Sequence, residues 1–250
     1  MERSLEETAR AVKPAVVGLG AAFGHDASFA EHGARLGLDR WAFYFGGRAG
    51  VLGPAGAEVV AAACGFFALD LVRRSWTAVL ASGRLDEIVR TDVELCVAWA
   101  RTHFGDGSDV VRAAALTSRV IEAADAAGRV LFAAWRALPD PIAGGAAAGA
   151  AADPAAVLGL NLLRLREHRG ASHLLAVAAE GLTPLEAILA GPGERKAAAN
   201  GWRPPYPAVA EPARLAAAEK RTDMLAGAPY AAVTVQERQE LVDLLRRLGG

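Results

Sequence analysis

The sequence predicts an all-α protein, or a mainly α protein with minimal β structure, that folds as a multi-helix bundle. Hydrophobic residues make up 53% of the 250-residue chain, which is enough to bury a sizeable core. The apolar residues are mostly Ala, Leu and Val, of which Ala and Leu are strong helix formers, and aromatic residues are only 6%. Long stretches that alternate apolar and polar residues, as half-buried strands do, are missing from the sequence.

The first expected elements are short and are divided by Gly and Pro. Residues 5–23 predict an amphipathic helix that Pro14 interrupts, because proline lacks the backbone N–H that a helix interior needs. Residues 28–36 predict a second helix, which Gly37 ends as a C-terminal cap. The dense aromatic cluster at 41–45 is expected in the core.

Further helices are expected before the middle of the chain. They cover 58–67, 84–103, 108–128 and a short stretch that reaches Leu138. In 84–103 the apolar residues recur every three or four positions and therefore share one face. Residues 139–141, Pro-Asp-Pro, end this series because a residue that precedes proline disfavours the helical conformation.

The middle of the chain has the composition of a linker. Residues 143–153 are Ala and Gly apart from the final Asp. Such low-complexity segments connect folded parts more often than they belong to them. The sequence therefore predicts two helical subdomains, an N-terminal one at 1–142 and a C-terminal one at 154–250.

The second subdomain is also expected to be helical. Residues 154–168 predict a helix that begins at an Asp-Pro cap, and Gly170 is expected to break it before a short helix to Ala179. Residues 183–190 begin with Thr-Pro-Leu-Glu, a capping box with proline at the first helical position. This combination is a specific signal for a helix start.

Residues 191–212 are not expected to form a regular helix, because prolines gather near their end. These prolines are Pro204, Pro205, Pro207 and Pro212. Helices are again expected at 213–226 and at 234–248, and the last begins with a Thr-Val-Gln-Glu capping box. Its apolar side consists of Leu241, Leu244, Leu245 and Leu248.

The charge and the apolar runs exclude several classes of protein. Lys and Arg total 27 against 28 Asp and Glu, so the net charge of -1 gives no overall attraction to a polyanion. The N-terminus lacks the apolar core of a signal peptide, and the longest apolar run, 59–69, is too short to span a bilayer. We therefore expect a cytoplasmic protein with no membrane contact.

Motifs for metals and for nucleotide cofactors are missing as well. Cys64 and Cys96 lie in apolar stretches, as buried small side chains do, and the sequence has no CxxC pair or metal-type spacing. It also has no GxGxxG, no GxxxxGK[ST] and no GxSxG motif. We therefore expect neither a cofactor nor a metal site.

Four motifs resemble those of a known family. They are YFGGRAGVLGPAGAEVV at 44–60, GRVLFAA at 128–134, LREHRGASH at 165–173 and TDMLA at 222–226. The chain resembles an actinobacterial family usually labelled helix-turn-helix, and the resemblance brings no general biochemical activity with it. Its motifs cover nearly the whole chain in order.

The resemblance implies a second subdomain like the winged-helix domain of MarR-type repressors. In that family a Gly-Trp pair is followed by the helix that enters the DNA groove and by a wing. Gly201-Trp202 is present here, but the proline-rich residues 203–212 follow it. The resemblance therefore implies a degenerate winged-helix-like unit that has lost its recognition helix and its wing.

The remaining candidate for a DNA-reading helix, 183–190, carries one charge, and that charge is the negative Glu186. Base readout needs Arg, Lys, Asn or Gln on the exposed face. From 160 to 203 six basic residues oppose four acidic ones, a small excess for phosphate contacts. Specific DNA binding is therefore not expected, although the family label keeps a transcriptional regulator as an alternative.

Arg48 and Glu58 lie in apolar surroundings on either side of a Gly-Pro turn. Buried charges are costly unless they are paired, so an internal Arg48–Glu58 ion pair is one interpretation. The other is a site in which Arg48 and the neighbouring Tyr44 bind an anionic ligand and Glu58 is the catalytic base. Asp70 is a second candidate for the catalytic base. The alternative interpretation of Asp70 is a surface carboxylate at the end of a helix.

The motif at 165–173 supplies the other ligand-binding candidates. His168 and His173 are five residues apart, whereas a metal-binding pair on a helix is spaced by four, as in HExxH. A structural hydrogen-bonding role or a place in a ligand pocket is therefore favoured over a metal site. Arg166 and Arg169 in the same motif are candidates for holding an anion.

Three functions are consistent with these patterns. The first is a small-molecule-handling protein of specialised metabolism on a repurposed helix-turn-helix scaffold, either a ligand-binding protein or a non-redox biosynthetic enzyme with a carboxylate base. The second is a DNA-binding transcriptional regulator. The third is a non-catalytic adaptor whose last helix pairs with a copy of itself or with another chain. For the first we expect an anionic small molecule as ligand and a homo-oligomer or a partner protein.

Overall fold

The computed structural model describes residues 2–138, 153–209 and 211–249. These residues form thirteen α-helices and three short 3-10 helices and contain no strand, which confirms the all-α prediction. The first eight α-helices are α1 (Leu5–Leu19), α2 (Ala27–Arg35), α3 (Arg40–Ala49), α4 (Ala57–Cys64), α5 (Leu69–Ala81), α6 (Leu85–Phe104), α7 (Ser108–Ala123) and α8 (Val130–Ala137). The others are α9 (Pro154–Ala179), α10 (Pro184–Ala190), α11 (Glu194–Ala199), α12 (Pro212–Gly227) and α13 (Val235–Gly249). The 3-10 helices are η1 (Ala22–His25), η2 (Gly50–Leu52) and η3 (Ala228–Ala232).

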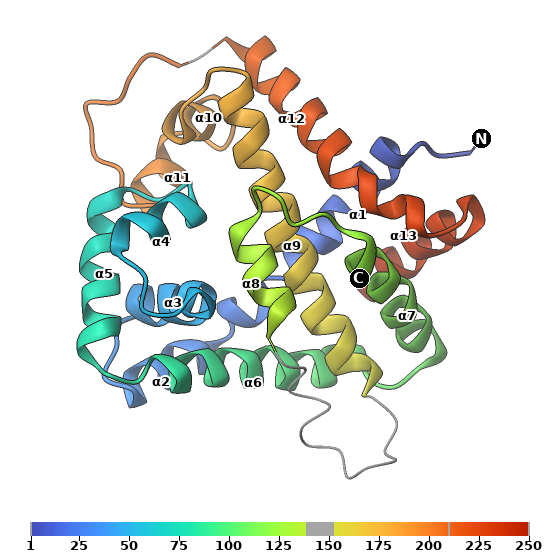
Figure 1. Ribbon diagram of the computed structural model, residues 1–250, viewed down its shortest axis with the longest axis horizontal. Coiled ribbons are helices and arrows are strands. Elements are labelled where there is room, and N and C mark those ends of the chain that lie inside the picture. Colours follow the sequence, from blue (N-terminus) through green and yellow to red (C-terminus); the bar gives the residue numbers. More distant parts are fainter. Residues whose placement is uncertain (1, 139–152, 210, 250) are drawn as a thin grey trace.

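Helix α9 runs through the middle of the molecule, with helices on several sides of it (Figure 1). It packs against α1, α6, α7, α8 and α12. A helix that is covered in this way is apolar around most of its circumference, and fifteen residues of α9 are buried. The buried residues include charged and polar side chains, which must find partners inside the protein.

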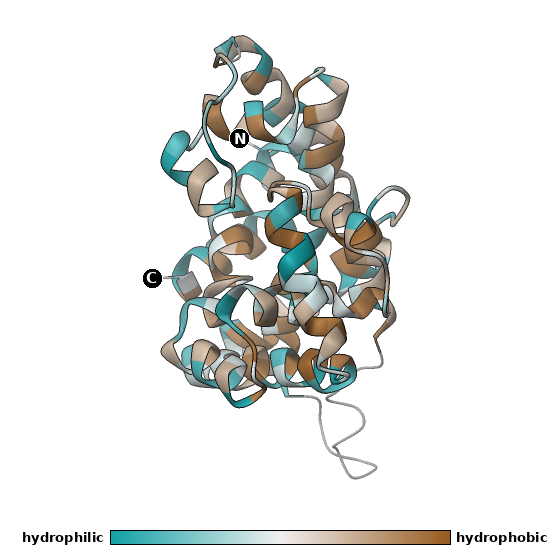
Figure 2. Cartoon of the chain, turned by 90° about the vertical axis from the view of Figure 1, so that its left-hand side faces the viewer, coloured by the Kyte–Doolittle hydropathy of each residue, from teal (hydrophilic) through white to brown (hydrophobic). Residues whose placement is uncertain are grey.

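Two hydrophobic cores meet at α9. One lies between α9 and the helices α1, α7 and α13, and the other between α9 and the helices α3 to α6 and α8. Leu158, Leu162 and Leu165 of α9 point into the first core, and Leu160 and Leu163 into the second. The colouring by hydropathy shows hydrophobic and hydrophilic residues mixed along most helices, as expected for helices that cover these cores (Figure 2).

Two predicted helix breaks are wrong. Helix α1 continues through Pro14 to Leu19, and α9 continues through Gly170 to Ala179. Both helices bury side chains on each side of the expected break, and this packing outweighs the local preferences of Pro and Gly. The continuity of α9 matters for function, because it places residues 166–173 on successive turns of one rigid helix.

Helices α3 and α6 approach each other closely at the glycines of the first motif. A Cβ atom on Gly47 would lie 2.4 Å from Oδ1 of Asp92, and one on Gly46 would lie 2.8 Å from a methyl group of Ile88. Both partners belong to α6. The paired glycines therefore serve helix packing, consistent with the absence of a dinucleotide fingerprint.

Several boundaries differ from the sequence prediction. No element was predicted at 69–81, where α5 lies, because its N-terminus has no capping side chain. The six-residue helix α11 falls inside 191–212, which was predicted to lack regular helix. Residues 203–209 form neither helix nor strand, as their prolines predict.

The predicted linker at 143–153 lies outside the described residues except for Asp153. Helix α9, which follows it, packs against α6, α7 and α8, which precede it. The division into 1–142 and 154–250, and the comparison of the second part with a winged helix, stay predictions.

Within the described ranges, no single helix is both long and apolar enough to cross a bilayer. Helices α9 and α10 reach the required length and composition only as a pair, and the chain bends by 96° between them.

Candidate functional site

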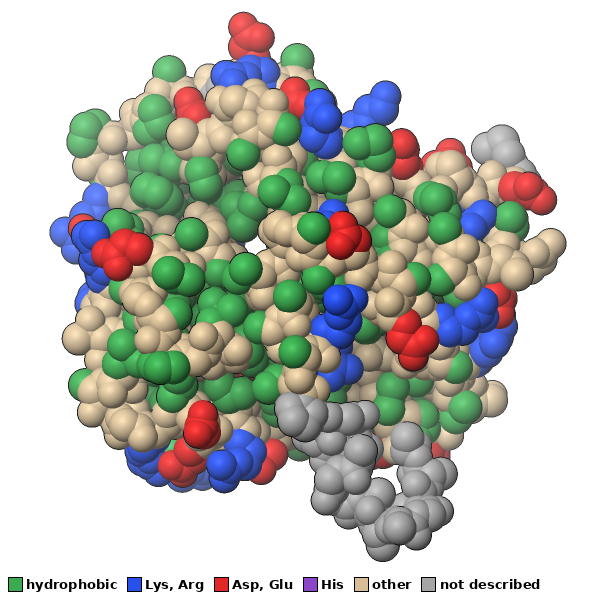
Figure 3. Space-filling model, in the orientation of Figure 1, with side chains coloured by type: hydrophobic (Ala, Val, Ile, Leu, Met, Phe, Trp, Pro, Cys, Tyr) green, Lys and Arg blue, Asp and Glu red, His purple; other side chains and the backbone are tan. Residues whose placement is uncertain are grey.

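A cavity of about 430 Å³ opens beside the central helix and is the candidate functional site. We call it the central cavity. Residues from α1, α3, α4, α9, α10, α11 and α12, together with the loop that follows α4, line it. In the space-filling view the surface is hollowed between the positions of α4 and α9, and apolar side chains surround the hollow (Figure 3). The volume lies in the range of small-molecule sites.

The apolar part of the wall is fixed by the loop between α4 and α5. Phe66 and Phe67 line the cavity from this loop. The carbonyl oxygen of Phe66 accepts hydrogen bonds from Nδ2 of Asn200 (3.0 Å) and from Nε1 of Trp202 (3.1 Å), and the backbone N–H of Ala68 donates to the carbonyl of Asn200 (2.9 Å). The end of α11 and the Gly-Trp pair therefore hold this wall in place.

Cationic side chains gather on the same cavity. They are Lys13, Arg48, Arg166, Arg169 and Lys196. Three carboxylates oppose these five cations: Glu219 lines the cavity, and Glu167 and Asp223 pair with arginines of the set. The cavity thus has an excess of two positive charges. An apolar pocket with such an excess attracts an anion whose remaining surface is hydrophobic.

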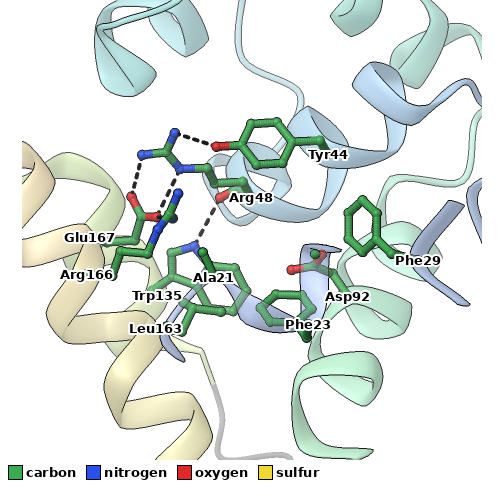
Figure 4. A pocket seen from close by; sticks show the side chains of 12 residues that line it. Ala21, Phe23, Phe29, Tyr44, Arg48, Asp92, Trp135, Leu163, Arg166 and Glu167 are labelled. Carbon is green, nitrogen blue, oxygen red and sulfur yellow. Dashed lines mark hydrogen bonds and ion pairs between the residues drawn. The ribbon is translucent and has the colours of Figure 1, made fainter. Parts of the chain in front are cut away.

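Glu167 lies between two of these arginines (Figure 4). Nε and Nη2 of Arg48 donate to its two carboxylate oxygens, each at 2.9 Å, and Arg166 donates to Oε1. Burial alone would raise the pKa of Glu167, but Arg48 and Arg166 lower it below its ordinary value. Nη1 of Arg48 also donates to the hydroxyl of Tyr44 at 3.0 Å. These contacts fix the Arg48 guanidinium at the cavity wall.

Arg169 is held from the opposite side by α12. Its Nη2 donates to Oδ1 of Asp223 at 2.8 Å and lies 3.6 Å from Oε2 of Glu219. Its Nη1 is buried and has no hydrogen-bond partner among the described residues. An unsatisfied buried guanidinium nitrogen is rare in folded proteins and is a place where a ligand or a water accepts a hydrogen bond.

A smaller cavity of about 40 Å³ adjoins the central cavity, and we call it the inner chamber. Tyr44, Arg48 and Arg166 line both spaces. The inner chamber also contains Asp92 of α6, whose carboxylate lies near Phe23 and Phe29 (Figure 4). Burial raises the pKa of Asp92 to about 7, although Arg166 opposes the change. A carboxyl group of this kind can take or give a proton near neutral pH.

A sequence profile described as a helix-turn-helix family matches residues 9–211. The chain belongs to this helix-turn-helix family. No curated protein and no solved structure matches it. The matched range of the helix-turn-helix family includes all five cations of the central cavity, whereas the part of the wall that α12 contributes lies beyond it.

The two short helices before the Gly-Trp pair carry few basic residues. Helix α10 carries only the negative Glu186, and α11, with Arg195 and Lys196, is six residues long. Residues 203–209, where other members of the family are expected to carry the groove-entering helix, have no regular structure, and no strand that could form a wing occurs in the described parts of the chain. In this member of the family, Trp202 instead supports the cavity wall.

Five of the six residues predicted to bind a ligand line the central cavity. They are Tyr44, Arg48, Arg166, Arg169 and His173. His168 does not line it: its ring packs edge-on against Phe132 with the ring centres 5.0 Å apart, and burial lowers its pKa to about 4. It is therefore a neutral core histidine, and the assignment of a ligand to the other five stays a prediction.

The two predicted catalytic carboxylates lie at the surface. The expected Arg48–Glu58 pair is wrong, because Arg48 pairs with Glu167 and Glu58 accepts hydrogen bonds from Arg73 at 2.9 and 3.0 Å. The hydrogen bonds from Arg73 lower the pKa of Glu58, which is the opposite of what a desolvated base needs. The side chain of Asp70 is 90% exposed, as its alternative interpretation expects. Neither residue lines the central cavity or the inner chamber.

The sequence analysis missed Glu167, Asp92 and the two lysines of the site. Asp92 had a signal in the sequence, because it falls four residues after Ile88 and four before Cys96, on the apolar face of the predicted helix. A charged residue at such a position indicates a functional site or a buried ion pair. The lysines had no signal, since α1 and α11 are brought together only by the tertiary fold.

The described residues contain no group of three His, Cys, Asp or Glu side chains that could hold a metal ion. Cys64 lines the central cavity, but burial raises the pKa of its thiol to about 11, so it stays protonated. The central cavity can therefore contact a ligand through cationic side chains and through apolar surface.

Proposed function

We propose that this protein binds a small anionic molecule with an apolar body in the central cavity. The observation that carries the proposal is the convergence of five cationic side chains on one apolar cavity inside the fold. Arg48, Arg166 and Arg169 are held in place by carboxylates, so they lose little conformational entropy when a ligand arrives. Lys196 is exposed, has no ion-pair partner among the described residues and adds an uncompensated charge to the cavity wall.

The geometry supports binding of a carboxylate or sulfonate on an aromatic or aliphatic body. Guanidinium groups donate paired hydrogen bonds to two oxygens of such an anion. The rings of Phe66, Phe67 and Tyr44 line the cavity and offer the apolar body an aromatic surface. This proposal deepens the small-molecule function expected from the sequence and moves it from Glu58 and Asp70 to the cavity beside α9.

Selective labelling of lysines tests the proposal in the unmodified protein. The chain has only three lysines, of which Lys13 and Lys196 line the cavity and Lys220 does not. We expect 4-formylbenzoate, an anionic aromatic aldehyde, to form a reducible imine at Lys13 and Lys196 faster than at Lys220. An excess of 2-naphthoate should protect the first two lysines and leave the third unaffected. Equal labelling of all three, without protection, contradicts the proposal.

A DNA-binding regulator is the second candidate, and family membership is the observation that favours it. Its test is the anisotropy of fluorescent duplexes, one from the region upstream of the gene and one of random sequence, at two salt concentrations. A regulator binds the first duplex more tightly and loses affinity as salt rises. Absence of binding at low salt excludes this candidate and leaves the cavity proposal unaffected.

The adaptor hypothesis is based on an apolar side of the last helix that could pair with another chain. Leu241, Leu244 and Leu245 of α13 are buried within the same chain, where α13 packs against α1 and α7. Their apolar side is therefore already covered, and self-association through this helix has no support from the packing. A homo-oligomer or a partner protein stays a prediction that sedimentation can test.

A further inference from the structure

His173 projects from α9 to the wall of the central cavity and is fixed there by α12. Its Nδ1 lies 2.9 Å from Oγ1 of Thr222, and Oγ1 of Thr222 lies 2.7 Å from the carbonyl oxygen of Ala218. The ring also stacks on Phe66, with the ring centres 5.3 Å apart and the planes at 25°. Two contacts from different elements thus set the position and the tilt of the imidazole.

The hydrogen bonds decide which ring nitrogen carries the hydrogen. A threonine hydroxyl has one hydrogen, and that of Thr222 is donated to the carbonyl of Ala218, which can only accept. Nδ1 of His173 must therefore donate to Oγ1 of Thr222. In the neutral ring, Nε2 is then left without a hydrogen and with a free lone pair. This is the same logic by which a second partner fixes the tautomer of a catalytic or metal-binding histidine.

The charges around His173 come from α1, α9 and α12. Oε1 of Glu219 lies 4.0 Å from Nε2, and Glu219 is itself held by Lys13 at 2.8 Å and approached by Arg169 at 3.6 Å. Burial lowers the pKa of His173, and Lys13 and Arg169 lower it further, while Glu219 and Asp223 raise it. The ring is therefore neutral at neutral pH, and a proton that arrives on Nε2 gains a nearby carboxylate.

We propose that His173 is the proton acceptor of the central cavity, with a substrate that is an apolar acid bearing a phenolic or enolic hydroxyl. The hydroxyl O–H bond breaks, its electron pair stays on the oxygen, and the proton forms a new bond to Nε2. The products are a bound phenolate or enolate and an imidazolium. The imidazolium faces Glu219, and the new oxyanion lies in a cavity with an excess of positive charge.

This inference rests on the proposed function, because the acid must first bind. It goes further by assigning the ligand a phenolic or enolic hydroxyl in addition to its anionic group. The geometry also separates the roles of the two histidines in the motif, since His168 lies in the core and His173 at the cavity.

The tautomer is measurable without any ligand. Long-range ¹H–¹⁵N correlation spectra at pH 8 report which nitrogen of each of the five histidines is protonated, and a His173→Gln variant assigns the signal. We expect His173 to be protonated at Nδ1. Thr222→Val removes the acceptor and should shift His173 toward the Nε2-protonated form, whereas Thr222→Ser should keep the original tautomer. An Nε2-protonated ring in the wild-type protein overturns the inference.

Proton transfer is tested with 6-hydroxy-2-naphthoate, whose absorption differs between the naphthol and the naphtholate, and with 2-naphthoate as the matched probe without the hydroxyl. We expect the naphtholate band of the bound hydroxy probe to appear at a lower pH than that of the free probe. Calorimetry in two buffers of different ionisation enthalpy should show no net proton release, because His173 keeps the proton. In His173→Gln, the ionisation constant of the bound naphthol should fall by at least about tenfold. The surface variant His103→Gln should behave as the wild type.

The outcomes separate the two proposals. Failure of 2-naphthoate to bind overturns the proposed function, and the inference falls with it. Binding of both probes without a shift of the naphthol ionisation to lower pH overturns the inference alone. A naphtholate band accompanied by release of one proton to the buffer also overturns it, because the cationic cavity then ionises the probe without His173.

Discussion

Replacing Asp92 by Asn should stabilise the protein at alkaline pH. The carboxylate lies in the inner chamber beside α3, and none of the described residues makes a hydrogen bond to it. Its pKa of about 7 in the folded protein exceeds the ordinary value of an aspartate, about 3.9, by about 3. The folded state therefore binds the proton more tightly than the unfolded state does. Stability is unaffected below about pH 4 and is lost as the pH rises through 7.

The size of the effect follows from the same difference. Each unit of pKa corresponds to about 1.4 kcal/mol, so ionised Asp92 costs the folded protein up to about 4 kcal/mol at pH 8. Asn has nearly the same shape and carries no charge. We expect Asp92→Asn to raise the free energy of unfolding by about 2–4 kcal/mol at pH 8 and by only about 1 kcal/mol or less at pH 4.5.

Urea unfolding between pH 4.5 and pH 8 measures this difference directly. Subtracting the wild-type curve cancels the titration of all other groups, which both proteins share. Glu94→Gln, on the exposed side of the same helix, is the matched control and should show no such pH dependence. A variant no more stable than the wild type at pH 8 would refute the placement of a desolvated carboxylate in the inner chamber. A confirmed cost would indicate that Asp92 is retained for function at the expense of stability.

The remaining predictions concern the ion pairs and the helix contact. Glu167→Gln leaves two guanidinium groups without their carboxylate, and urea unfolding should show a loss of about 3 kcal/mol or more. Gly47→Ala brings a methyl group against Asp92, and we expect it to lower stability by about 1–3 kcal/mol, which a thermal melt detects. Glu58→Gln removes only an exposed pair with Arg73, so both the urea midpoint and the dissociation constant of 2-naphthoate should stay unchanged. A weaker affinity of Glu58→Gln for 2-naphthoate would show that Glu58 contributes to ligand binding.

Local signals in the sequence predicted local structure well. The capping boxes at Thr183 and Thr234 are present, with reciprocal hydrogen bonds to Glu186 and Glu237. Gly170 misled because its local preference could not reveal that α9 is enclosed by other helices. Helix starts that depend on capping atoms within one turn could be predicted from the sequence. Helix continuity that depends on burial by other helices could not.

The candidate site was predictable only in part for the same reason. The motif at 165–173 and Arg48 identified the cavity wall, because they combine charges with apolar surroundings. The partner of Arg48 was assigned wrongly, since Glu58 is close in sequence whereas Glu167 is 119 residues away. Pairing over that distance is set by the tertiary fold, which places Arg48 of α3 within reach of Glu167 of α9 and which composition and periodicity do not encode. The tautomer of His173 likewise depends on Thr222 of α12, which the motif does not include.

Calorimetric titration with 2-naphthoate and with its uncharged analogue 2-naphthalenemethanol tests the central claim most directly. We predict that the wild-type protein binds the carboxylate at least about tenfold more tightly than the alcohol. Lys196→Gln should weaken binding of the carboxylate alone, and Lys220→Gln, outside the cavity, should leave both affinities unchanged. Equal affinity for the two compounds, or no binding of either, would contradict the assignment of the central cavity to an anionic ligand.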